Sequence, residues 1–109
     1  MARLTSRFWV DAYLARLRLS DIPAFVVAHG DDTAGDVLVR LNLLDGTSSL
    51  FQRRYDLLAD SRAWECLSQG PDREIDDSLT RSRARDPDMW IIEVEDRHGR
   101  HMLDAPGLG

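Results

Sequence analysis

The spacing of apolar residues along the chain predicts two helices and five strands. Apolar side chains recur at helical intervals over residues 6–19, where Ser6 is a natural N-cap and Pro23 follows the end of the pattern. A narrower helical stripe covers residues 72–85, with acidic residues at its start and arginines at its end, as the helix dipole favours. Alternating or continuous apolar runs predict the strands. We expect strands at residues 24–29, 36–44, 62–67 and 89–95. A further strand is expected between the turn at Gly46 and residue 56.

This order, α-β-β-β-β-α-β, predicts an α+β fold with a mixed five-stranded sheet. The crossover through the second helix is expected to leave strands 62–67 and 89–95 parallel. Because strand 24–29 and the first half of strand 89–95 are apolar on both faces, we expect the two helices on opposite sides of the sheet. We expect a single compact domain at residues 1–96 and an extended C-terminal tail at 97–109.

The hairpin around Gly46 can close in two registers. A two-residue turn would set Val39 opposite Gln52. A loop one residue longer, with Gly46 in a bulge, would set Leu41 opposite Phe51 and Val37 opposite Tyr55, which places both aromatic side chains on the apolar face. We expect the second register.

Composition removes several kinds of chemistry. All 14 basic residues are arginines, so a Schiff base, a phosphate-loop lysine and a desolvated amine base are excluded. The lone Cys66 excludes an intrachain disulfide, and its alternation with apolar neighbours predicts a buried, inert thiol. A net charge of −5 argues against nucleic acid as a partner. The three tryptophans, Trp9, Trp64 and Trp90, are expected in the core.

The chain carries no sequence signal for a membrane or a cofactor. Its apolar runs are much shorter than the ~20 residues of a membrane span, and its N-terminal residues lack the apolar core of a signal peptide. We therefore expect a cytoplasmic protein, which a single unpaired cysteine also fits. No glycine-rich phosphate motif or zinc-ligand spacing is present, so we expect no cofactor and no metal.

Arg16 is the residue that packing explains least, because it lies in the middle of the apolar arc of the first helix. Its guanidinium either snorkels to water, pairs with a carboxylate such as Glu93, or binds an anion. Glu93 and Glu95 share one face of the last strand and, with Asp88, form a candidate carboxylate site. A strand that emerges into solvent would give the same pattern.

A second candidate site consists of Arg81, Arg83 and Arg85, which could contact a phosphate. Their spacing of two does not place all three on one face of a helix. Complementation of the helix dipole and solubility explain them adequately without a ligand.

Four stretches together are similar to a known family. They are Leu4-Thr5-Ser6, Phe8-Trp9-Val10, Ala34-Gly35 and Asp86-Pro87-Asp88-Met89-Trp90-Ile91-Ile92-Glu93-Val94-Glu95. In these stretches the chain resembles a family of small uncharacterised bacterial proteins, the domain of unknown function 1491 family. The resemblance implies a complete single domain, and it brings no activity, cofactor or catalytic residue.

Our leading hypothesis is a small cytosolic binding or protein-interaction module without catalytic activity. Its partner would be a second copy of the chain or an unidentified protein, and the strand at residues 24–29, which follows Pro23, is an edge that a second copy could pair with. The alternatives are a small enzyme in which Arg16 holds an anionic substrate beside the carboxylates, and a weak nucleotide or RNA binder that uses the arginine patch.

Overall fold

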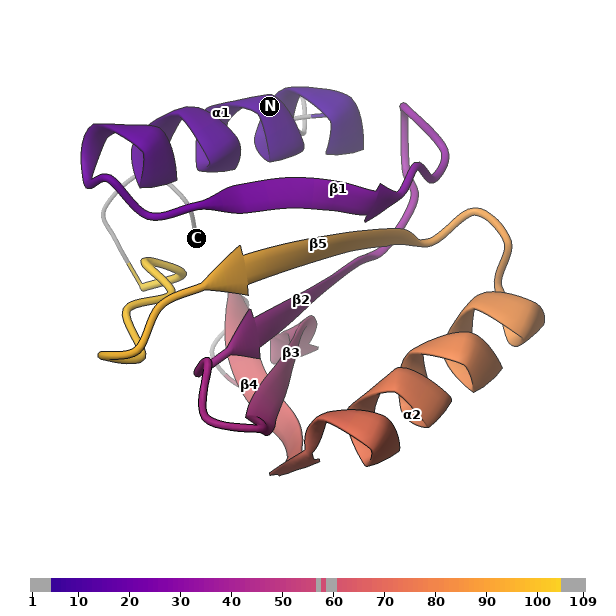
Figure 1. The fold of residues 1–109 in the computed structure, drawn as a ribbon. Helices are drawn as coiled ribbons and strands as arrows, with labels where there is room; N and C mark the ends of the chain where they lie inside the picture. Colours follow the sequence, from indigo (N-terminus) through magenta and orange to yellow (C-terminus); the bar gives the residue numbers. More distant parts are fainter. Residues whose placement is uncertain (1–4, 57, 59–60, 105–109) are drawn as a thin grey trace.

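The computed structural model describes residues 5–56, 58 and 61–104 and has the predicted element order. Two helices and five strands form an α+β fold around one mixed sheet (Figure 1). The elements are α1 (Ser6–Leu19), β1 (Ala24–Ala28), β2 (Val37–Asn42), β3 (Thr47–Asp56), β4 (Ser61–Pro71), α2 (Asp72–Arg85) and β5 (Trp90–Glu95).

The last strand of the chain lies inside the sheet, whose strand order is β1-β5-β2-β3-β4. β5 pairs antiparallel with β1 and parallel with β2, which leaves β1 and β4 as the two edges. Because β3 is antiparallel to both β2 and β4, β4 runs parallel to β5, as predicted. The two strands are not neighbours, since β2 and β3 lie between them.

The helices cover opposite faces of the sheet, as predicted (Figure 1). On one face, Trp9 and Tyr13 of α1 pack against alternate strand residues such as Val39 and Ile92. On the other face, α2 and the sheet enclose a smaller core. That core consists of Leu38, Leu50, Ile75, Leu79, Met89 and Ile91.

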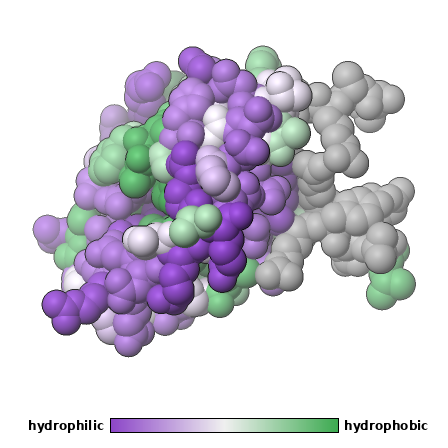
Figure 2. All heavy atoms as spheres, turned by 90° about the vertical axis from the view of Figure 1, so that its right-hand side faces the viewer, coloured by the Kyte–Doolittle hydropathy of each residue, from purple (hydrophilic) through white to green (hydrophobic). Residues whose placement is uncertain are grey.

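The edge strand β1 keeps apolar side chains in water. Phe25, Val26 and Val27 are 46%, 38% and 56% exposed, although they follow one another in one strand. Figure 2 shows green, hydrophobic atoms gathered at the left of the view, the side on which β1 lies, above the mainly purple surface of α2. Isolated exposed apolar residues are ordinary in proteins, whereas these three are consecutive in one edge strand.

The β2–β3 hairpin closes in neither of the registers considered from sequence. Val39 lies opposite Phe51, where Leu41 was expected. The turn is centred one residue earlier than predicted, because Leu44 as well as Gly46 adopts a left-handed backbone, with φ of 61° and 90°. Since the pairing moves by two residues, each side chain keeps its face, and Phe51 still packs on the α1 side.

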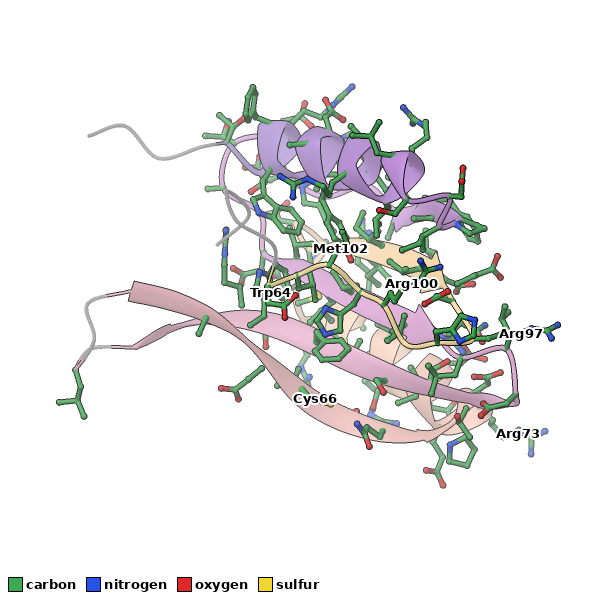
Figure 3. All side chains as sticks on the ribbon, turned by 90° about the vertical axis from the view of Figure 1, so that its left-hand side faces the viewer. Trp64, Cys66, Arg73, Arg97, Arg100 and Met102 are labelled. Carbon is green, nitrogen blue, oxygen red and sulfur yellow. The ribbon has the colours of Figure 1, made fainter. Side chains whose placement is uncertain are left out.

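Residues 97–104 are not the predicted extended tail, because they fold back against the α1 side of the sheet. Leu103 is 1% exposed within the larger core. The Tyr13 hydroxyl donates to the backbone oxygen of His101 at 2.6 Å, and burial raises the pKa of this tyrosine. Figure 3 shows Arg100 and Met102 on this segment, between α1 and the β3–β4 hairpin. The rest of the predicted tail, 105–109, lies outside the described residues.

The loop between β1 and β2 is held between the start of α1 and the start of β5. The Ser6 hydroxyl donates to the Gly35 oxygen at 2.6 Å, and the Asp31 amide donates to the Asp88 oxygen at 2.9 Å. The Trp90 indole donates to the Asp31 oxygen at 2.8 Å. A Cβ at Gly35 would lie 2.2 Å from the Asp88 oxygen, so this approach requires glycine. Three of the stretches that carry the family resemblance therefore meet at one structural contact.

The burial of the tryptophans and of the cysteine matches the prediction only in part. Trp9 and Trp90 are 2% and 1% exposed, as predicted, and Trp64 is half-buried with its ring 5.1 Å from that of Trp9. Cys66 is exposed, so the prediction of a buried thiol is wrong. Alternation along β4 gave the face of the side chain, but β4 is an edge strand and this part of its face is uncovered (Figure 3).

The buried position of Leu103 gives a direct test of the packed C-terminal segment. Leu103→Ala is expected to lower the free energy of unfolding by about 2–5 kcal/mol, because it leaves a cavity in the core. Urea denaturation measures this change. The matched control is Leu19→Ala, at a leucine that is 84% exposed, with an expected change within about 0.5 kcal/mol. Equal, small losses in both variants would contradict the packing.

Candidate functional site

Arg40, on β2, is only 8% exposed although its guanidinium is permanently charged. The residues directly beside it in the sheet are Leu50 of β3 and Glu93 of β5. All three face α2, since Leu50 belongs to the smaller core. A buried charge of this kind persists only when other charges or hydrogen bonds compensate it.

Four side chains surround the guanidinium, and with it they form what we call the Arg40 cluster. Nη1 of Arg40 forms an ion pair with Asp76 and lies 3.8 Å from Oε1 of Glu93. Nη2 lies 3.4 Å from Oδ1 of Asp72. Nε donates to Oγ of Ser48 at 3.2 Å, and that hydroxyl donates to Asp72 at 2.6 Å.

The cluster holds three carboxylates against one guanidinium, so negative charge is in excess when all of them are ionised. Glu93 responds to its burial and to this excess of negative charge, and its pKa is raised above its ordinary value. Burial is the main cause, the neighbouring Glu95, Asp76 and Asp72 add to it, and Arg40 opposes it. The Glu93 side chain is 17% exposed, whereas that of Asp76 is 60% exposed and well solvated.

The Arg40 cluster opens into a groove of about 620 Å³ between β1 and α2, which we call the β1–α2 groove. Its polar lining has two ends, because Asp76 and Arg83 are seven residues apart on α2, which corresponds to about 10 Å along a helix. Glu93 and Arg40 lie with Asp76 at one end, and Arg83 lies at the other. The apolar lining consists of Val27, Ala28, Leu79, Ala84 and Ile91.

The structure separates the candidate residues of the carboxylate site. Arg16 lies on α1, which covers the opposite face of the sheet from Glu93, so the Arg16–Glu93 pair, one of the three alternatives for Arg16, is wrong. Glu95 shares a face with Glu93 and adds to the negative charge around it. Asp88 lies in the turn before β5, where its amide donates to the side chain of Asp86 at 3.1 Å.

The three candidate phosphate-binding arginines do not form one patch. Nη2 of Arg83 donates to the backbone oxygen of His29 at 3.2 Å, and Arg83 lines the β1–α2 groove. Arg81 lines a separate hollow of about 310 Å³ that also contains Glu74. Arg85, in the last turn of α2, is exposed. Each arginine therefore serves a different part of the surface.

Arg40 was not among the candidate residues predicted from sequence, because within residues 36–44 it alternates with apolar residues as an exposed polar residue of a strand would. The signal that could have identified it is the burial of its own face. Leu38, two residues earlier on that face, is apolar, and the predicted second helix begins with Asp72 and Asp76 on one side of its first turns. A charged residue on a strand that is apolar on both faces needs an oppositely charged partner, which these two carboxylates supply.

Two further observations concern metals and membranes. Within residues 5–56, 58 and 61–104, no group of three or more His, Cys, Asp or Glu side chains is arranged to hold a metal ion. The carboxylates of the Arg40 cluster converge instead on a guanidinium. In the same described ranges, neither helix has the length and apolar character needed to span a membrane.

These features define a small single-sheet α+β domain with a buried arginine beside a surface groove. The chain belongs to the family described as "Protein of unknown function (DUF1491)", whose model matches residues 4–104. The match confirms the resemblance that the sequence stretches indicated.

Solved structures of relatives share the fold. A crystal structure of a DUF1491 family protein from Caulobacter crescentus CB15 has 34% identity and a TM-score of 0.85, over 95% of this chain and 98% of that chain. An NMR structure of a DUF1491 family protein from the same organism has 33% identity and a TM-score of 0.81, over 97% of each chain. The solution structure of protein Atu0922 from A. tumefaciens has 30% identity and a TM-score of 0.72, over 86% of each chain. No curated protein matches the chain.

Removal of the buried guanidinium tests whether the cluster is a structural unit. Arg40→Met is expected to lower the free energy of unfolding by about 3–5 kcal/mol, because the variant leaves carboxylates close together without their cation. Arg97→Met, at an exposed arginine in a turn, is the control and should change stability by less than about 0.5 kcal/mol. Similar unfolding midpoints in urea for the two variants would be evidence against the cluster.

Substitution of Glu93 tests the direction of its pKa shift. Because the folded protein holds the Glu93 proton more tightly than the unfolded chain does, this group lowers stability as pH rises from its ordinary pKa to the raised one. Glu93→Gln is therefore expected to be more stable than the native chain at neutral pH, and the difference should vanish under acidic conditions. Urea denaturation over a series of pH values measures it, and a stability loss that is constant with pH would contradict the shift.

Proposed function

We propose that this protein is a binding module without catalytic activity, and that its β1–α2 groove holds a segment of a partner protein that carries a basic side chain. The observation that carries the proposal is the union, in one groove, of apolar walls and an excess of negative charge at one end. Apolar walls with a few placed polar groups are the usual composition of a binding site.

The form of the groove supports an extended segment as its occupant. Its volume of about 620 Å³ lies within the ~300–1,000 Å³ typical of ligand sites, and it runs beside a strand and along successive turns of a helix. Val27, which lines it, is 56% exposed, so burial under a partner would remove apolar surface from water. A partner's aliphatic side chains would pack there.

Charge supports a basic residue in that segment. Glu93 and Asp76 face the groove, and Arg40 neutralises only part of the negative charge of its three carboxylate partners. An arginine or lysine of the partner would complete the compensation. At the far end Arg83 would repel a second cation and favour an acidic group, which gives the bound segment a direction.

The polar side chains of the Arg40 cluster already have hydrogen-bond or ion-pair partners within the cluster, which supports binding rather than catalysis. The Ser48 hydroxyl is committed to Asp72, and Asp72 and Asp76 are both paired with Arg40. A nucleophile or general base would need a free partner of suitable geometry. We also propose that the protein acts in the cytoplasm, which the unpaired and exposed Cys66 thiol supports.

A peptide library selected on the immobilised protein tests this function. Selection is expected to enrich peptides that combine arginine or lysine with aliphatic residues. Ala84→Trp, which fills the groove at an exposed position, should weaken binding of an enriched peptide more than tenfold in isothermal titration. Glu93→Gln should weaken basic peptides and leave neutral analogues unchanged, because it removes one of the groove's charges.

The control is Ala63→Trp, which adds the same side chain at an exposed position on β4 and should leave affinity unchanged. Failure of the selection to enrich basic residues would overturn the charge argument. Equal loss in Ala84→Trp and Ala63→Trp would place the binding surface elsewhere.

A further inference from the structure

We infer that β1 pairs antiparallel with the β1 of a second copy of this chain, about a two-fold axis at Val26. The first observation is that β1 ends the sheet. It pairs with β5 on one side, and the strand order places no further strand of the described chain on the other side. The backbone donors and acceptors along that side are therefore a template for another strand.

This edge lacks the protection that charged side chains give. β1 consists of Ala-Phe-Val-Val-Ala and holds no charged residue, so its guards are Pro23 before it and the irregular pairing with β5 between Val26 and Ala28. The opposite edge, β4, carries Glu65 and further polar residues along its length. Charged side chains are one of the devices by which natural proteins keep an edge unpaired, and of the two edges only β4 carries them.

The sequence of β1 is self-complementary when two copies run antiparallel. With Val26 opposite Val26 of the second copy, Phe25 lies opposite Val27 and Ala24 lies opposite Ala28. Every pair is apolar, and no like charges meet across the interface. An aromatic side chain opposite a β-branched one is a favourable cross-strand pair, and the two-fold axis forms it twice.

The second copy also covers what the fold leaves exposed. Phe25 is 46% exposed and lies opposite Glu93 in the register with β5, so it shares the α2 side of the sheet with that residue. Val27 lines the β1–α2 groove on the same side. The two Phe25–Val27 pairs would thus bury the apolar side chains that are exposed along the β1 edge.

Pairing about this axis places both α2 helices on the same side of a continuous ten-stranded sheet, twice the five strands of one copy. The two β1–α2 grooves would then form one trough, with the Phe25–Val27 pairs as its centre. The pairing itself does not rest on the proposed function, whereas the role of the trough as a longer binding site does.

Sedimentation equilibrium of the full chain tests the pairing. The mass is expected to rise from 12.4 kDa toward twice that value as concentration increases through about 10–100 µM, because an edge-to-edge contact is small and its affinity modest. Val26→Lys should abolish the rise, since it sets two charges together at the axis. Leu67→Lys is the matched control, at a residue that is 38% exposed like Val26 but lies on the β4 edge.

Cross-linking tests the register and does not depend on Val26→Lys folding. In a Cys66→Ser background, Val26→Cys should form an intermolecular disulfide under oxidation, because the two positions face each other at the axis. Leu67→Cys in the same background should not. A mass of 12.4 kDa at every concentration together with no selective disulfide would overturn the inference.

Failure of this inference is distinguishable from failure of the proposed function. If Ala84→Trp leaves the dimer intact and the selection enriches no basic peptide, the β1 pairing stands and the proposed groove ligand is refuted. A monomer that still binds basic peptides in the groove would do the reverse. Loss of self-association on Leu67→Lys but not on Val26→Lys would move the interface to β4.

Discussion

The insertion of β5 between β1 and β2 is the constraint on which the rest of the structure depends. Because strand residues alternate, β5 supplies both cores at once: Ile92 packs under α1 and Ile91 packs under α2. The same strand sets Glu93 directly between Arg40 of β2 and Phe25 of β1. The hydrophobic pairing that completes the sheet therefore also assembles the polar end of the groove and makes β1 an edge.

The buried guanidinium explains why α2 sits where it does. Besides the apolar contacts of Ile75 and Leu79, two carboxylates of its first turns, Asp72 and Asp76, pair with Arg40 and tie the helix to β2. Buried ion pairs contribute modest net stability, but an unpaired charge in that place is costly, so they act against wrong arrangements. The amide of Asp72, which donates to the Gly46 oxygen at 2.9 Å, fixes the start of the helix against the hairpin turn.

Sequence patterns predicted the element order, the mixed sheet and the two covered faces, because each follows from local periodicity. They could not predict which polar residues would meet. Arg16 was singled out on a helical wheel with Glu93 as one candidate partner, yet Glu93 faces Arg40 across a parallel strand pair that joins distant parts of the chain. The prediction of a buried Cys66 was wrong for a related reason, since alternation gives the face of a strand but not whether that face is covered. Leu103 lies in a segment rich in glycine and charge, and its burial depends on a space beside α1 that only the assembled sheet creates.

The uncovered part of the sheet follows from the path of the second helix. The chain leaves the sheet at the β4 edge and returns at β5, so α2 crosses over β3 and β2 and packs against Leu50 and Leu38. Nothing in that crossover brings a helix over β1, and the C-terminal segment that follows β5 packs on the α1 side. With one helix on this face, the five-stranded sheet thus leaves the edge strand β1 exposed and a groove open between β1 and α2. Since burial of apolar surface drives association, the partners that we propose at β1 and at its groove would remove this surface from water.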